Sequence, residues 1–196
     1  MKTKVYRFDV LYKGLENKIN RTIDASENYQ LSKLGYAILA SFETLAYHLF
    51  FVECDGVRYE IPMNEEFEDK NTVDPRSIKL KQMGLEPGSS MTMIYDYGCE
   101  QEFYICLVDV FEMDSGTSSN YPRVVSGKGK GIIDDMPADE LKKVINRIDK
   151  NGESNQMYRT PYDTEEVWDY RKFDLQSANT SLKSDINAIA RGYEKE

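Results

Sequence analysis

The sequence is poor in the residues that build the common metal and disulfide sites. Its 196 residues include one histidine, His48, and three cysteines, Cys54, Cys99 and Cys106. The cysteines are odd in number and have neither C-x-x-C nor metal-ligand spacing, a usage typical of free thiols in a reducing compartment. We therefore expect no disulfide framework, no structural zinc and no bound metal or other cofactor.

Long apolar runs are also absent. Residues 1–7 lead directly into an alternation of polar and apolar residues, without the apolar core of a signal peptide, and no later run could span a bilayer. We expect a cytoplasmic protein that has no membrane partner.

Positive charge is scarce as well. The 25 Lys and Arg residues are outnumbered by 34 Asp and Glu residues, which gives a formal net charge of -9. Such a surface repels phosphate groups, which argues against direct binding of DNA or RNA. A basic protein is the easier partner.

The chain does have enough apolar material for a core, since 40% of its residues are hydrophobic and 12% are aromatic. A chain of this size can fold as one domain that carries a helical appendage. We expect an α+β core domain over residues 1–150. Residues 151–196 should form an aromatic-rich connecting segment and a C-terminal helix that packs on the core.

The first forty residues alternate as two strands and then change to helical spacing. Residues 6–12 and 19–23 have the period of two that is typical of strands with one buried face. Ser26 or Asn28 can cap the helix that follows, because either side chain can accept a backbone N–H bond. The apolar stripe that should lie on the sheet consists of Leu31, Leu34, Ile38 and Phe42.

A second hairpin can be placed in register from its turn. Asp55-Gly56 tolerates the positive φ angles of a two-residue type I′ loop. Counting outward from this turn sets Glu53 opposite Arg58 and gives the hairpin one apolar face. The acidic residues 62–77 that follow have no period and are expected to form a solvated loop.

A third hairpin follows a short helical turn at residues 78–85. Gly98-Cys99 fits a type II′ loop, which would set Asp96 opposite Gln101. The returning strand, residues 103–111, is apolar on both faces except at one aspartate, as expected near the centre of a covered sheet. The fold class is therefore α+β, with a mixed, largely antiparallel sheet of hairpins packed on one main helix in a β-grasp-like way, and with extra C-terminal helices.

The residues around the third turn carry a resemblance to a known family. Tyr95-Asp96-Tyr97-Gly98 resembles part of the signature Y-D-F-G-D-x-W-x-H of the plasmid pRi ORF-three-like family, also met as passenger proteins of insertion elements. The resemblance implies an α+β fold with no established biochemical activity. Further matches are Val5 to Val10, His48-Leu49-Phe50 in place of H-L-H, Leu85 to Gly88, Tyr121-Pro122-Arg123, Gly127 to Asp135, and Phe173-Asp174-Leu175 with Asn179 and Leu182.

The chain departs from the family pattern at four positions. Cys99 replaces an aspartate, Gln101 a tryptophan, and Phe103 and Phe50 each replace a histidine. Histidines and carboxylates together suit zinc, manganese or iron, so a family member that keeps these polar residues could hold a metal ion at these positions. The polar positions that remain here form a candidate cluster: His48, Asp96, Asp134 and Asp135.

Each of these residues also has a structural explanation. By the counted register His48 shares the inward face of the second hairpin, which favours a hydrogen-bonded core histidine. Asp96 can accept local backbone N–H bonds beside its turn. Asp135 precedes a helix with its apolar stripe at residues 141–148 and is placed to act as the N-cap, with Asp134 before it.

Two further segments are candidate partner surfaces. Residues 126–131, a serine followed by alternating glycine and lysine, lack the spacing of a phosphate-binding loop, so we expect a mobile surface loop in which Lys128 and Lys130 could contact a partner. Trp168 and Tyr170 belong to an aromatic-rich stretch that either docks on the core, which we favour, or recognises another chain. The final helix must bury its stripe against its own domain or a second copy, which leaves a homodimer open.

Two functions follow from the sequence. We favour a plasmid-associated or mobile-element-associated, non-catalytic protein-interaction module, to which no catalytic residue is assigned. The alternative is a divalent-metal-dependent hydrolase or nuclease-like enzyme that uses Asp96, Asp134 and Asp135, with His48 assisting. Convergence of these four residues on an open cleft would favour the enzyme, and scattered positions would exclude it.

Overall fold

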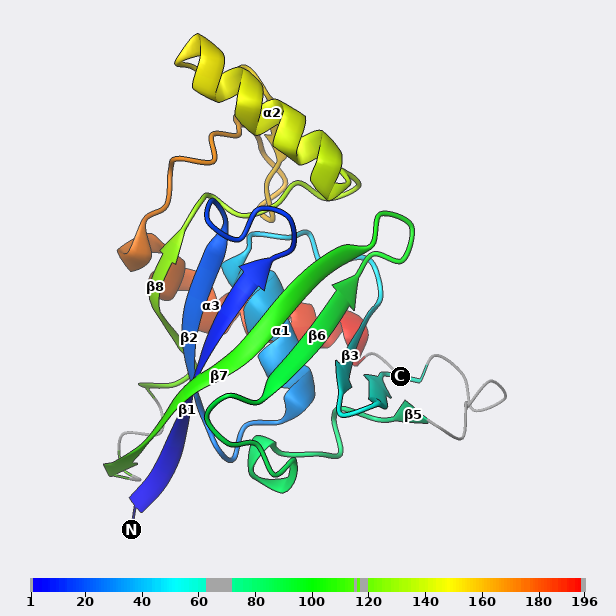
Figure 1. Ribbon diagram of the computed structural model, residues 1–196, viewed down its shortest axis with the longest axis vertical. Coiled ribbons are helices and arrows are strands. Elements are labelled where there is room, and N and C mark those ends of the chain that lie inside the picture. Colours follow the sequence, from blue (N-terminus) through cyan, green and yellow to red (C-terminus); the bar gives the residue numbers. More distant parts are fainter. Residues whose placement is uncertain (1, 63–71, 115, 117–119, 195–196) are drawn as a thin grey trace.

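A computed structural model describes residues 2–62, 72–114, 116 and 120–194. An eight-stranded sheet has the strand order β5-β4-β3-β6-β7-β1-β2-β8, and β9 and β10 form a separate two-stranded sheet (Figure 1). The elements are β1 Lys2–Tyr12, β2 Asn20–Ser26, α1 Leu31–Ser41, β3 Phe50–Cys54, β4 Val57–Glu60, β5 Thr72–Val73, a 3-10 turn Leu80–Gln82, β6 Ser90–Tyr95, β7 Gln101–Asp114, β8 Arg123–Lys128, α2 Ala138–Asn151, β9 Met157–Arg159, β10 Glu165–Val167 and α3 Leu175–Tyr193.

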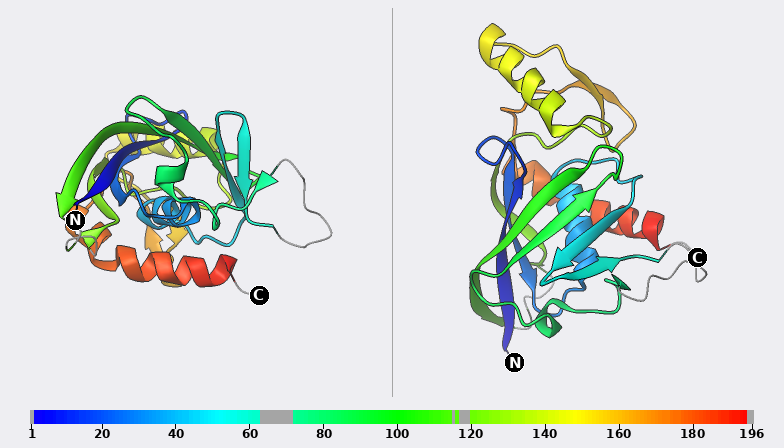
Figure 2. Two further views of the ribbon diagram at one scale, coloured as in Figure 1. Left: turned by 90° about the horizontal axis from the view of Figure 1, so that it is seen from below. Right: turned by 45° about the vertical axis from the view of Figure 1, so that its right-hand side comes forward.

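The coarse fold prediction is confirmed: the protein is α+β, and all sheet pairs except β4 with β5 are antiparallel. α1 lies between the curved sheet and α3, as the view from below shows (Figure 2). β7 lies between β6 and β1, near the centre of the sheet as expected from its apolar sequence. The β-grasp-like detail stays a prediction. Of the acidic loop predicted over residues 62–77, positions 63–71 lie outside the described residues.

The predicted stripe of α1 is buried. Leu31, Leu34, Ile38 and Phe42 are each at most 1% exposed. The predicted cap is wrong, because the helix starts at Leu31 after Gln30, which makes no side-chain cap bond within the described structure. Ser26 instead ends β2, and its hydroxyl accepts from Asn28 N at 3.3 Å.

The second hairpin has the predicted register and the third does not. Glu53 pairs with Arg58 across the Asp55-Gly56 turn. In the third hairpin Tyr95 pairs with Gln101, one residue away from the predicted register. The reason is Asp96, which adopts φ 57. Its carbonyl oxygen accepts hydrogen bonds from Cys99 N and Glu100 N, so the loop is longer than two residues.

The glycine-lysine stretch is packed, and its prediction as a mobile surface loop is wrong. A Cβ at Gly129 would lie 2.4 Å from Lys18 O, and one at Gly131 would lie 2.2 Å from Phe42 O. Lys130 Nζ lies 3.5 Å from Glu43 Oε2, whereas Lys128 is exposed. The absent side chains allow this close approach of backbones, which holds the chain in place as it leads toward residue 134.

The aromatic segment docks on the rest of the protein. Trp168 is 0% exposed and Tyr170 is 9% exposed, so neither is available as the partner surface that the sequence left open. The buried stripe of α3 consists of Leu182 and Ile186, and α3 packs on α1. This contact buries the stripe within one copy, and a homodimer stays a prediction. Among the described residues, no helix is long and apolar enough to cross a membrane.

Asp174 caps α3 by accepting from Ser177 N at 2.6 Å. Because the exposed first turn would lose this acceptor, Asp174→Ala should lower the free energy of unfolding by about 1 kcal/mol. Urea denaturation measures this change. Gln176→Ala, an exposed substitution in the same turn, is the control and should change stability by less than about 0.5 kcal/mol. Equal effects of the two variants would contradict a capping role.

Candidate metal centre

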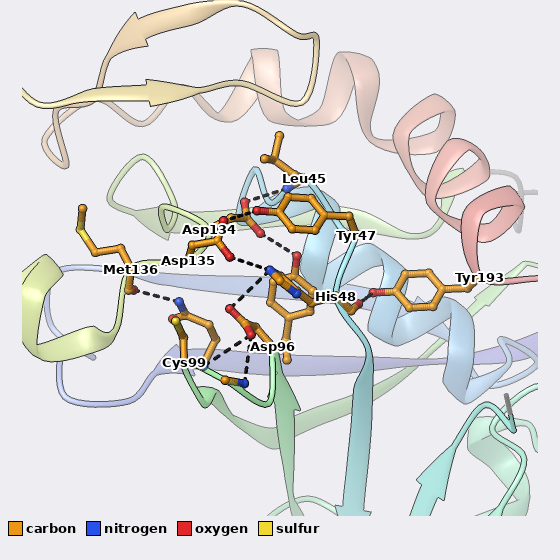
Figure 3. A network of polar contacts seen from close by, with 12 residues as sticks. Leu45, Tyr47, His48, Asp96, Cys99, Asp134, Asp135, Met136 and Tyr193 are labelled. Atoms are coloured by element: carbon orange, nitrogen blue, oxygen red, sulfur yellow. Dashed lines mark hydrogen bonds and ion pairs between the residues drawn. The ribbon is translucent and has the colours of Figure 1, made fainter. Parts of the chain in front are cut away.

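The sheet brings His48 and Asp96 together. β3 pairs antiparallel with β6 so that Phe50 lies opposite Tyr95. The residues before β3 therefore lie beside the residue after β6, and Asp96 N donates to Leu49 O at 3.0 Å. Asp135 reaches the same place from the segment between β8 and α2 (Figure 3).

These three residues form the cluster that we call the 48/96/135 site. His48 Nε2 lies 2.8 Å from Asp135 Oδ1 and 3.5 Å from Asp96 Oδ2. One donor atom from each residue lies within 4.8 Å of the other two. Three of the four candidate residues named from the sequence, His48, Asp96 and Asp135, therefore lie close together.

Asp96 has one satisfied and one unsatisfied oxygen. Oδ1 accepts from Gly98 N at 3.1 Å and from Cys99 N at 3.4 Å, which is the turn role predicted from the sequence. Oδ2 is buried without a hydrogen-bond partner among the described residues, and Asp96 as a whole is 4% exposed. A buried carboxylate oxygen without a partner costs free energy, so this atom requires a positive ligand or a donor.

His48 differs from its predicted inward position. β3 begins only at Phe50, so the alternation of the strand does not extend to His48, whose side chain is 27% exposed. Its ring lies between Tyr47, with centroids 4.3 Å apart, and Tyr95, with centroids 5.7 Å apart. Its backbone carbonyl accepts from Tyr193 OH. Nε2 is thus directed at the two carboxylates.

The prediction of Asp135 as a helix cap is wrong. α2 begins at Ala138 with Pro137 at the N-cap position, and Asp135 adopts φ 59 instead. Its carboxylate accepts from Tyr47 OH and contacts His48, and the Tyr47 bond and the imidazole lower the pKa of this carboxyl. The side chain is 63% exposed, so the site opens to solvent on this side.

Asp134 does not join the cluster. Its Oδ1 accepts from Tyr95 OH at 2.6 Å and its Oδ2 from Leu45 N at 2.8 Å. Burial raises the pKa of this carboxyl, although both bonds oppose that shift. Asp134 therefore connects β6 to the segment before His48, and both of its oxygens are already used.

Three residues that support the site were missed by sequence reasoning: Tyr47, Gln101 and Tyr193. Gln101 is 0% exposed, donates to Met136 O at 2.9 Å and accepts from Tyr12 OH, which ties the Asp135 segment to the sheet. Gln101 could have been found from the sequence as a polar amide side chain at the start of an otherwise apolar strand. Nothing in the sequence pattern distinguishes Tyr47 or Tyr193 from the other tyrosines.

Cys99 lies beside Asp96 but is a poor nucleophile. Burial, together with the charges of Asp96 and Asp135, raises the pKa of its thiol to about 11. A thiol with this pKa is protonated near neutral pH, and the thiolate is the reactive form. The site therefore offers oxygen and nitrogen donors and no activated sulfur.

The two distances from His48 Nε2 suit coordination of one ion, and the three ligand atoms all lie within 4.8 Å of one another. Ligand bonds of about 2.0–2.2 Å at angles of about 90–110° place neighbouring donors about 3.0–3.5 Å apart. The separations of 2.8 Å and 3.5 Å from His48 Nε2 are close to that range. One imidazole with two carboxylates suits zinc, manganese or iron, and three protein ligands leave coordination positions open for water.

Comparison with known proteins gives the fold and the family. No curated protein is significantly similar to this chain. The crystal structure of a protein of unknown function from Methanosarcina mazei Go1 is similar, with a TM-score of 0.70 and 23% identity, covering 89% of this chain and 96% of that chain. The family model described as plasmid pRiA4b ORF-3-like protein matches residues 4–177, a range that includes all four candidate residues and ends near the start of α3. The resemblance found in the sequence is confirmed, and the chain belongs to the plasmid pRiA4b ORF-3-like protein family.

Proposed function

We propose that this protein binds a divalent transition-metal ion through His48 Nε2, Asp96 Oδ2 and Asp135 Oδ1. The single observation that carries this proposal is the buried Oδ2 of Asp96, which has no hydrogen-bond partner among the residues that the structure describes and lies 3.5 Å from the imidazole. An ion coordinated there would satisfy this atom and neutralise two neighbouring carboxylates.

An ion pair without metal explains the cluster less well. A protonated His48 has one N–H at Nε2, and Asp135 Oδ1 at 2.8 Å is the nearer acceptor. Asp96 Oδ2 would then remain without a hydrogen bond in a buried position, at a cost of about 1–3 kcal/mol. A metal ion binds all three donors at once, which supports the metal over the ion pair.

Metal-dependent hydrolysis is the second candidate, favoured by the exposure of the Asp135 side chain, 63%. A metal ion bound by three protein groups can lower the pKa of a coordinated water, which then acts as the nucleophile. The sequence offered as its alternative an enzyme that uses Asp96, Asp134 and Asp135 with His48 assisting. Both oxygens of Asp134 accept from Leu45 N and Tyr95 OH, so in this candidate the ligands would be Asp96, Asp135 and His48. If the ion has a structural role alone, the protein is a non-catalytic module, and its net charge of -9 supports a basic partner.

The test is a titration of chelator-treated protein with Mn²⁺, Zn²⁺ and Mg²⁺, followed by thermal unfolding and calorimetry. Mn²⁺ and Zn²⁺ should raise the unfolding temperature, because a ligand at 100 times its Kd stabilises the folded state by about 2.7 kcal/mol. Mg²⁺ should bind more weakly, since imidazole is a poor ligand for it. No shift with any of the three ions would contradict the proposal. Cleavage of ester and phosphodiester probes by the Mn²⁺-loaded protein, lost on chelation, would add the hydrolase activity.

A further inference from the structure

Tyr193, the last residue of α3, reaches the 48/96/135 site from outside the family match. Its hydroxyl donates to the backbone carbonyl of His48 (Figure 3). The match to the family ends at residue 177, so this contact comes from a part of α3 that lies outside the match. The contact links the C-terminal helix directly to a proposed metal ligand.

The position of this hydroxyl is fixed by two aromatic contacts. The Tyr193 ring stacks on Tyr36 with centroids 5.5 Å apart and an interplanar angle of 22°. It also meets Phe50 edge-on, with centroids 5.2 Å apart. Tyr36 is 0% exposed and Phe50 is 2% exposed, so both rings belong to the core. Packing on α1 and β3 therefore aims the hydroxyl at one carbonyl group.

The His48 backbone needs such support. The segment between α1 and β3 has no regular structure, and it contains left-handed residues at Glu43, φ 56, and Ala46, φ 53. Asp134 holds its Leu45 amide, and the Tyr193 hydroxyl holds the His48 carbonyl. Because Nε2 is carried on this backbone, a shift of the peptide moves the nitrogen relative to both carboxylates.

We infer that Tyr193 is a positioning residue for the His48 ligand, so that ion binding and docking of the last turn of α3 are coupled. The inference rests on the proposed metal site. Coupling between two sites is reciprocal: if the docked helix raises the affinity for the ion, the bound ion stabilises the docked helix by the same factor. The net free energy of one hydrogen bond, here from Tyr193 to the His48 carbonyl, predicts a change of about three- to tenfold in the affinity for the ion.

The test compares Tyr193→Phe with Tyr162→Phe by Mn²⁺ calorimetry. Tyr193→Phe keeps the ring and its packing but removes the hydroxyl, so the variant should fold. Tyr162→Phe is the matched control, since Tyr162 OH also contacts α3, at Asp185, 3.2 Å away, without touching the site. Tyr193→Phe should weaken Mn²⁺ binding about three- to tenfold, and Tyr162→Phe should leave the affinity unchanged.

Hydrogen exchange supplies the second readout. In the wild type, Mn²⁺ should slow amide exchange in residues 186–193, and this protection should be smaller in Tyr193→Phe. Tyr193→Phe could instead lower the unfolding temperature of the metal-free protein while leaving the Mn²⁺ affinity and the exchange protection unchanged. This result would show that Tyr193 has only a structural role. It would overturn the inference but leave the proposed metal site standing. If the wild type binds no Mn²⁺, the proposed metal site fails, and the inference falls with it.

Discussion

Asp96→Asn is expected to abolish ion binding while leaving the fold intact. An amide oxygen can accept the same bonds from Gly98 N and Cys99 N that Oδ1 accepts, and asparagine tolerates the left-handed conformation at φ 57. The charged Oδ2, however, becomes an uncharged NH₂ group that cannot bind a cation. Substitutions outside the coordination shell already cost 10–100-fold in affinity, so loss of this ligand should cost at least about 100-fold, or about 3 kcal/mol.

Calorimetry with Mn²⁺ measures the loss of ion binding, and far-ultraviolet circular dichroism shows whether the fold stays intact. Asp55→Asn is the matched control, because Asp55 is also a left-handed aspartate in a hairpin turn, at φ 50, but lies in the β3–β4 hairpin at the end away from His48. It should bind Mn²⁺ as the wild type does. If Asp96→Asn retains the affinity of the wild type, Asp96 is not a ligand and its carboxylate serves the turn alone.

Gly131→Ala is expected to lower the free energy of unfolding by at least about 3 kcal/mol. Gly131 has φ 119, which alanine rarely adopts, and an added Cβ would lie 2.2 Å from Phe42 O. The next residue, Ile132, donates to that same carbonyl at 3.1 Å. The backbone of this segment must therefore move away from α1, and Asp134 and Asp135 follow it within four residues of Gly131.

Chemical denaturation measures the loss, and Gly152→Ala provides the control. Gly152 is also left-handed, at φ 80, but a Cβ there would meet nothing within 4 Å, so this change should cost only about 1 kcal/mol. The same displacement should weaken Mn²⁺ binding in Gly131→Ala and not in Gly152→Ala. A cost in Gly131→Ala no larger than that in Gly152→Ala would mean that the segment is free, as the sequence alone suggested.

Local patterns predicted the parts of the fold that local chemistry decides. The stripe of α1 and the Asp55-Gly56 turn depend on periodicity or on residues that tolerate positive φ, and both are found. The third hairpin differs by one residue from the predicted register because the carbonyl oxygen of Asp96 accepts from Cys99 N and Glu100 N, which makes the loop longer than the two residues that the Gly98-Cys99 pair suggests.

The site itself could be named from the sequence but not assembled. His48, Asp96 and Asp135 were singled out as polar positions, yet their convergence depends on β3 lying beside β6, a pairing of strands that are not consecutive. Each residue also had a sufficient local explanation, as core histidine, turn aspartate or helix cap. Only the structure shows that Asp135 lies before the start of α2 and contacts His48 instead of capping the helix. Strand order is a tertiary property, and no short sequence pattern encodes it.

The distinction between a metal centre and a plain ion pair decides the account. In the ion pair, His48 Nε2 lies 2.8 Å from Asp135 Oδ1, and Asp96 Oδ2 has no hydrogen-bond partner within the described part of the chain. In the metal centre, the same three atoms would all bind one ion. The two states differ in electron density at a single point, which a crystal can reveal.

The most direct measurement is anomalous diffraction from crystals grown with Mn²⁺. The account predicts a peak about 2.0–2.2 Å from His48 Nε2, Asp96 Oδ2 and Asp135 Oδ1, with water in the remaining positions. Crystals that show no peak at this point, with Asp135 still bonded directly to the imidazole, would contradict it.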